Sequence, residues 1–182
     1  MKKTLRKLTA ARDDVAPIRV ERSLSHSHTI EGYVVGIGKK WALLSVTDDG
    51  GYFDGYLAFR LADVKRVSRD TSLTGRFAPT QPEWPPAAPQ GLDLDSRAGL
   101  LTTAAALFPL VGVQEERQRE GLWIGNLIEL DNKRVWLREI RPDASWHDFD
   151  QGYRRRAVTS VIFDDRYMRA LIAVGGEAPS AD

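Results

Sequence analysis

Residues 31–46 read E-G-Y-V-V-G-I-G-K-K-W-A-L-L-S-V, which is an apolar segment, a short turn of glycine and lysine, and a second apolar segment. Residues 123–140 repeat this plan as W-I-G-N-L-I-E-L-D-N-K-R-V-W-L-R-E-I, with Asp131-Asn132-Lys133 at the turn. Short apolar runs on either side of Gly, Asn or Asp are typical of β-hairpins. The sequence therefore predicts two hairpins, one in each half of the chain.

The segments that follow the two hairpins also match. In the first half, Phe53-Asp54-Gly55-Tyr56 leads into an apolar run and a last short strand. In the second half, Phe149-Asp150-Gln151-Gly152-Tyr153 leads into the same two features. This order of features at similar spacing indicates an internal repeat. The strands expected from it cover residues 33–37, 41–46, 57–61, 122–130, 135–140 and 152–163.

Each repeat is preceded by one more predicted strand and by a helix. The strands are expected at Ile18–Ser23 and Val111–Gln118, and the first helix at Lys3–Ala11. Ser96 is placed to cap the second helix, Arg97–Leu107, which ends before a proline. Asp164-Asp165 marks the expected start of a terminal helix, whose dipole these acids complement.

The domain boundaries follow from a proline-dense stretch at residues 79–90, which is typical of an extended linker. Each unit is small enough that a lone core gives only marginal stability. We therefore expect the two units to pack against each other, with the apolar helix around residues 100–107 between them. The predicted division is a first unit at 1–78, a linker at 79–92, a second unit at 93–175 and a disordered tail at 176–182.

A helix followed by five short, bent strands is the order of the Sm-like fold, a small barrel of the SH3 type. Residues 32–35 and 41–44 resemble the Gly-x-hydrophobic strand and the x-Val-Leu-Leu strand of that family. Residues 153–161 resemble the Tyr-Lys-His-Ala-Ile-Ser-Thr-Val segment of the bacterial Sm-like RNA chaperones, with one residue inserted. The chain is also similar to uncharacterised bacterial proteins whose repeats carry Asp-Gly-Tyr. The resemblance implies a mainly β fold of two tandem five-stranded Sm-like, SH3-type barrels with short helices.

The second repeat is the expected RNA-binding part. Tyr153 offers a stacking face, and Arg154 and Arg156, as alternate residues of the expected strand, offer phosphate contacts from one side. The first repeat has Tyr56-Leu57-Ala58-Phe59 where the chaperones carry a Lys-His pair, so little direct contact is expected there. The structural alternative for the arginines is a solvated edge strand whose charges discourage aggregation.

The five tryptophans form two groups. Trp41, Trp123 and Trp136 fall in strands and are expected to fill or line the barrels. Trp84, in the linker, and Trp146, in a loop, are candidate anchors for a protein partner, or else each covers a barrel end. A protein–protein adaptor, or an inhibitor that covers its partner, is therefore the alternative to RNA binding. Self-association into a homo-oligomer stays open.

Composition narrows the class of protein. With 26 basic and 25 acidic residues the net charge is +1, so an RNA site requires a local basic patch. The chain has no cysteine, which excludes disulfides and thiolate chemistry and favours a cytoplasmic location. No apolar stretch approaches the length of a membrane span. The three histidines lack a ligand spacing, and we expect a non-enzymatic protein with no metal site and no cofactor.

Overall fold

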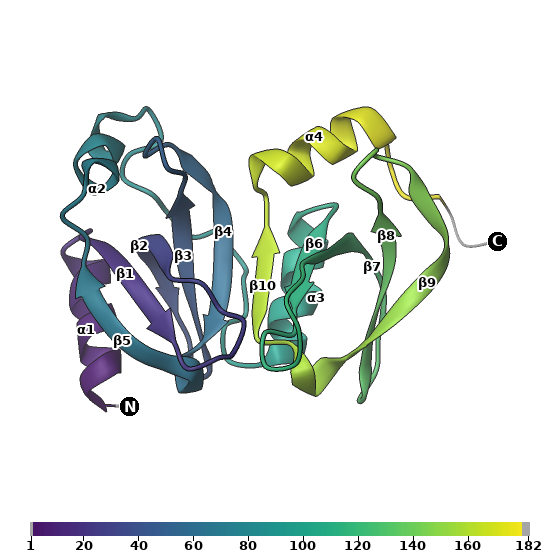
Figure 1. The fold of residues 1–182 in the computed structure, drawn as a ribbon, viewed down its shortest axis with the longest axis horizontal. Coiled ribbons are helices and arrows are strands. Elements are labelled where there is room, and N and C mark those ends of the chain that lie inside the picture. Colours follow the sequence, from purple (N-terminus) through teal and green to yellow (C-terminus); the bar gives the residue numbers. More distant parts are fainter. Residues whose placement is uncertain (1, 180–182) are drawn as a thin grey trace.

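Figure 1 shows the fold given by a computed structural model, which describes residues 2–179. The first half of the chain contains α1 (Lys2–Asp13), β1 (Pro17–Arg22), β2 (Ile30–Ile37), β3 (Trp41–Thr47), β4 (Phe53–Arg60), β5 (Val64–Arg69) and α2 (Leu73–Phe77). The second half contains α3 (Arg97–Leu107), β6 (Val111–Gln114), β7 (Trp123–Leu130), β8 (Arg134–Ile140), β9 (Trp146–Arg154), β10 (Ser160–Phe163) and α4 (Arg166–Gly175). None of the described helices is long and apolar enough to cross a membrane.

All ten strands belong to one antiparallel sheet, in the order β5-β1-β2-β3-β4-β10-β6-β7-β8-β9. At its middle, β4 of the first half pairs with β10 of the second, and Figure 1 shows the two strands side by side. The predicted mainly β fold is confirmed. The strands form one continuous open sheet and not two closed barrels, because β4 and β10 satisfy each other's edge hydrogen bonds.

The internal repeat is visible in the strand order, because each half runs fifth, first, second, third, fourth strand. The irregularities recur as well: the ladder shifts between Val34 and Gly36 in one half and between Leu127 and Glu129 in the other. Such bulges bend a strand and increase its twist. The two halves therefore bend their second strand at the same place.

The helix predictions agree closely with the structure. α3 spans Arg97–Leu107 as expected, and the Ser96 side chain accepts a hydrogen bond from the Gly99 amide at 2.9 Å. Asp165 caps α4 in the same way through the Met168 amide at 2.6 Å. The short helix α2 was not anticipated by any sequence pattern.

Several strand predictions are wrong in detail. The strand expected at Val111–Gln118 ends at Gln114. The expected strand over residues 152–163 is interrupted, because Arg155–Ala157 form a 3₁₀ turn between β9 and β10. Likewise Leu61–Asp63 form a 3₁₀ turn after β4. The two turns let the chain leave one strand and begin the next in a different direction. β9 also begins at Trp146, in a segment expected to be a loop.

The proline-rich segment packs along the first repeat. Trp84 lies edge-on to Tyr33, with ring centroids 5.2 Å apart, and Tyr56 donates a hydrogen bond to the Ala87 carbonyl at 3.1 Å. Further along, the Leu94 carbonyl accepts from the Trp41 amide at 3.1 Å. Of the tail predicted at residues 176–182, residues 180–182 lie outside the described residues.

The largest hydrophobic cluster joins the two repeats. Its buried members include Leu100 and Leu101 of α3, Trp41 and Leu43 of β3, and residues of the second repeat such as Val161. Two further clusters lie within single repeats, one beneath α1 and one beneath α4. The expected packing of the two units against each other agrees with this shared cluster, while α3 itself lies mainly against β6 and β7 of the second repeat.

A buried ion pair also crosses the junction. The Arg22 guanidinium donates to both carboxylate oxygens of Glu116 at 2.6 Å, and both side chains are 2% exposed. Glu116 further accepts from the hydroxyls of Thr159 and Ser160, at 2.9 and 2.5 Å. The carboxylate is therefore the centre of a buried polar network at the junction, although the Arg22 Nε has no hydrogen-bond partner among the described residues.

Glu116→Gln tests this network. The substitution keeps the size of the side chain but leaves the Arg22 charge buried without its carboxylate, which costs about 3–5 kcal/mol when a buried pair is broken. Urea denaturation should show that loss. Glu120→Gln is the control, because Glu120 is exposed and meets only His28 at 3.5 Å. Similar stabilities for the two variants would contradict the account of the junction.

Candidate nucleic-acid interface

The three predicted arginines lie at the end of β9. β9 ends at Arg154, and the following 3₁₀ turn carries Arg155 and Arg156. All three line one hollow of about 550 Å³, together with Arg97, Asn132, Lys133 and Arg134. The expected arrangement, with only Arg154 and Arg156 sharing a face, is wrong, because the turn brings Arg155 to the same hollow.

A second hollow of about 420 Å³ adjoins the first and is built by the first repeat. Its basic residues are Lys39 and Lys40 in the β2–β3 turn, Arg60 at the end of β4, and Arg97, which lines both hollows. We call this surface the basic band and define it by nine residues: Lys39, Lys40, Arg60, Arg97, Lys133, Arg134, Arg154, Arg155 and Arg156.

The fold explains why these residues gather. In an antiparallel sheet, alternate strands end at the same edge, so every second turn also lies at that edge. The β2–β3 and β7–β8 turns and the ends of β4 and β9 all lie at the lower edge of the sheet in Figure 1. Because β4 and β10 pair, the edge runs on from one repeat into the other. Arg97, at the start of α3, sits where the two halves meet.

Carboxylates neutralise only part of the basic band. Lys39 pairs with Asp95 at 2.8 Å, and Arg60 lies 3.5 Å from Asp63. No acidic residue lines either hollow. Seven members form no ion pair with any carboxylate in the described part of the chain: Lys40, Arg97, Lys133, Arg134, Arg154, Arg155 and Arg156.

Arg97 is the most unusual member. It is half-buried, with its guanidinium carbon 5.9 Å from the centre of the Trp41 ring, and its buried Nε has no hydrogen-bond partner among the described residues. Burial lowers the pKa of Arg97, and the positive charges of Arg60 and Arg155 lower it further. A cation held without a partner beside two like charges is a position that an anion stabilises.

Tyr153 does not belong to this surface. It is 4% exposed, packs 5.2 Å from the Trp123 ring and donates a hydrogen bond to Glu139. Burial raises the pKa of Tyr153, and the hydrogen bond to Glu139 raises it further. The expected stacking face is therefore covered by the protein's own core.

The two tryptophans proposed as partner anchors lie in different places and both make internal contacts. Trp84 is half-buried against Tyr33, at a hollow of about 370 Å³ near the end of β5. Trp146 is half-buried beside α4, and its indole N–H donates to the Gly175 carbonyl at 3.2 Å. Each covers part of a core, which was the alternative interpretation.

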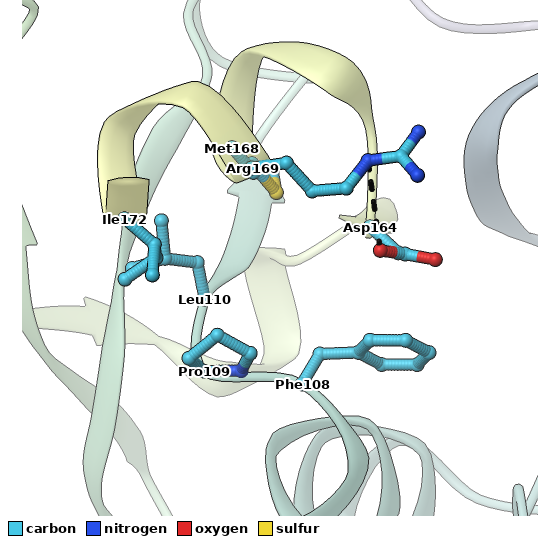
Figure 2. A pocket seen from close by; sticks show the side chains of 7 residues that line it. All are labelled: Phe108, Pro109, Leu110, Asp164, Met168, Arg169 and Ile172. Atoms are coloured by element: carbon cyan, nitrogen blue, oxygen red, sulfur yellow. Dashed lines mark ion pairs between the residues drawn. The ribbon is translucent and has the colours of Figure 1, made fainter. Parts of the chain in front are cut away.

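A smaller apolar hollow of about 130 Å³ lies under α4 and is drawn in Figure 2. Phe108, Pro109 and Leu110 line one side, and Met168 and Ile172 the other. At its rim, Arg169 Nε lies 3.9 Å from Asp164 Oδ1, and burial raises the pKa of that acid. Small-molecule sites usually measure about 300–1,000 Å³, so this hollow is a packing gap.

Sequence reasoning missed most of the basic band. The lysines of both hairpin turns were predicted only to form turns. Their equivalent positions were a usable signal, because Lys40 and Lys133 each precede the third strand of their repeat. Arg97 was seen only as the first residue of a helix. The described residues hold no group of three His, Asp or Glu side chains arranged to bind a metal.

Arg97→Met tests whether the Arg97 side chain is needed for the stability of the fold. Methionine keeps the apolar contact with Trp41 while removing a buried charge that repels its neighbours, so the free energy of unfolding should stay unchanged or rise. Denaturant titration checks this. A fall of more than about 1 kcal/mol, the scale of a lost stabilising contact, would show that Arg97 supports the fold.

Comparison with known proteins found no matching family model, no similar curated protein and no similar solved structure.

Proposed function

We propose that this protein is a non-enzymatic binding module that holds single-stranded RNA along the basic band. The observation that carries the proposal is a continuous surface of nine basic side chains, seven of them without an ion pair among the described residues. Arginine guanidinium groups bind phosphate in a bidentate manner and stack on bases. The band supplies both kinds of contact over two adjoining hollows.

Arg97 gives the surface a preferred point for phosphate. Its unpartnered Nε and the two neighbouring arginines favour an anion with several oxygens. A phosphodiester at this point would be within reach of groups from both repeats. An RNA strand would thus cross the midline of the sheet and not stay on the second repeat alone.

The side chains of the site favour a single strand over a duplex. Unpaired bases can stack on aromatic rings and guanidinium groups, whereas the bases of a duplex are not accessible in this way. The half-buried Trp136 lies beside the band, with the Arg134 guanidinium 5.5 Å from its ring centre. An aromatic ring next to a cation is the usual platform for an unstacked base.

The proposal extends to the fold family. The repeated strand order, the shared bulges and the 3₁₀ turn before each fifth strand support the interpretation of each half as a Sm-like unit. The site differs from the one expected from that resemblance. The first repeat contributes three basic residues, and Tyr153 is buried and contributes no contact. A protein-directed adaptor is the alternative, but Trp146, one of its two candidate anchors, is held inside its own repeat.

Replacing Arg154, Arg155 and Arg156 together by glutamine tests the proposal. Each phosphate neutralised in a single-stranded complex contributes about 0.7 to the slope of log affinity against log salt. The triple variant should therefore bind a fluorescent single-stranded RNA more weakly, with a slope shallower by up to about 2. Anisotropy titrations at several salt concentrations measure both quantities.

The matched control replaces Arg76 of α2 and Arg166 and Arg169 of α4 by glutamine, which removes the same charge at the opposite edge of the sheet, where Figure 1 shows these helices. This variant should bind nearly as well as the parent protein. Equal losses for the two triple variants would mean that only net charge matters. An absence of RNA binding by the parent protein at low salt would refute the proposed function and favour the adaptor.

A further inference from the structure

Each repeat has a hollow at the place where its fifth strand ends. In both repeats the walls come from the start of the first strand, the residue after the fifth strand and the helix that follows. Asp70 follows β5 and Asp164 follows β10, so the two hollows occupy equivalent places. The second hollow measures about 130 Å³ and is narrowed by Met168 and Ile172 of α4 (Figure 2), whereas the first measures about 370 Å³.

The first hollow is wider because α2 differs from α4. Gly75 is the third residue of α2, as Met168 is of α4, so a large side chain is missing here. α2 also lies close to β1, since a Cβ atom at Gly75 would meet the Pro17 ring at 2.8 Å. The proline-rich segment adds Trp84 to the wall, edge-on to Tyr33. The volume falls in the range of small-molecule sites, about 300–1,000 Å³, and we call this space the Trp84 hollow.

Two arginines give the Trp84 hollow a positive charge. Arg69, at the end of β5, and Arg76 of α2 line it, and neither forms an ion pair with a carboxylate in the described part of the chain. The one acidic residue in the wall, Asp70, has a side chain that is 3% exposed. Its carboxylate accepts hydrogen bonds from the hydroxyls of Ser72 and Thr74 at 2.8 and 3.0 Å. The charge of Asp70 is thus held inside the protein, and the two guanidinium groups stay free for a ligand.

The rest of the wall suits a ring. Trp84 is half-buried there, and apolar contacts come from Val15, Pro17 and Pro79. Aromatic and apolar side chains bind flat rings, and arginine binds a carboxylate or a phosphate in a bidentate manner. We propose that the Trp84 hollow binds a small aromatic anion, a compound of one or two rings that carries a carboxylate or a phosphate. A cationic ring compound is excluded by the two like charges.

This site is separate from the basic band. α2 lies at the upper edge of the sheet in Figure 1, and the basic band lies at the lower edge. Binding in the Trp84 hollow therefore does not depend on RNA binding, and the loss of either activity leaves the other intact.

Four probes test the two halves of the ligand. Adenosine monophosphate and indole-3-acetate each join a ring to an anion, whereas adenosine and inorganic phosphate supply one half each. Calorimetry on the full-length protein should give one of the joined compounds a dissociation constant below about 1 mM, and at least about tenfold below those of both halves. Tighter binding of the nucleotide identifies a phosphate ligand, and tighter binding of indole-3-acetate a carboxylate. Equal binding of phosphate alone, or no binding of either joined compound, would overturn the proposal.

Replacing Arg69 and Arg76 together by glutamine tests the anion contacts. Both side chains are exposed, so the fold should tolerate the change. The dissociation constant of the tighter probe should rise by about tenfold or more, because two charge-assisted contacts are lost. The matched control replaces Lys65 and Arg66, which are exposed on the same strand but do not line the hollow, and should bind like the parent protein. Equal losses for the two double variants would contradict the site.

Nuclear magnetic resonance locates the bound probe. The indole N–H signal of Trp84, identified as the one that disappears in Trp84→Phe, should shift as the probe is added. The signals of Trp41 and Trp136, which lie beside arginines of the basic band, should stay in place. Shifts confined to those two tryptophans would place the anion on the basic band and overturn the assignment of the Trp84 hollow.

Discussion

The backbone pairing of β4 with β10 is the contact on which the rest of the molecule depends. It joins two repeats into one sheet and leaves neither half with an unpaired edge at the midline. The same contact brings Arg22 and Glu116 together in a buried pair and lets α3 pack on residues of both halves. Each half has a smaller hydrophobic cluster of its own, but the largest cluster is shared between the two halves.

The basic band is a consequence of that pairing. Hairpin turns and strand ends from both repeats meet at one edge of the sheet. Their lysines and arginines form a strongly basic surface there, although the net charge of the whole chain is only +1. Arg97 completes the surface from α3 with a guanidinium that lacks a partner among the described residues. The structure tolerates this local repulsion because the shared core around α3 holds the helix in place.

The local features of the fold could be predicted from the sequence, and the contacts between distant segments could not. The hairpins and the helix caps at Ser96 and Asp165 depend on residues that are close in the sequence, so sequence patterns predict them. The pairing of β4 with β10 depends on which edges meet, and no local pattern encodes this. Tyr153 was expected to offer a stacking face for a base, but its ring is buried against Trp123 of the neighbouring core. The contribution of Arg97 could not be predicted either, because the arginines close to it, Arg60 and Arg155, are distant in the sequence.

The central claim is that one RNA strand contacts both repeats across the midline of the sheet. Ultraviolet cross-linking of a short single-stranded RNA to the intact protein, followed by mass spectrometry of the peptides, measures this directly. The account predicts cross-links in three segments: residues 39–41, residues 133–136 and residues 154–156. Cross-links confined to one repeat, or found only on α1, would contradict it.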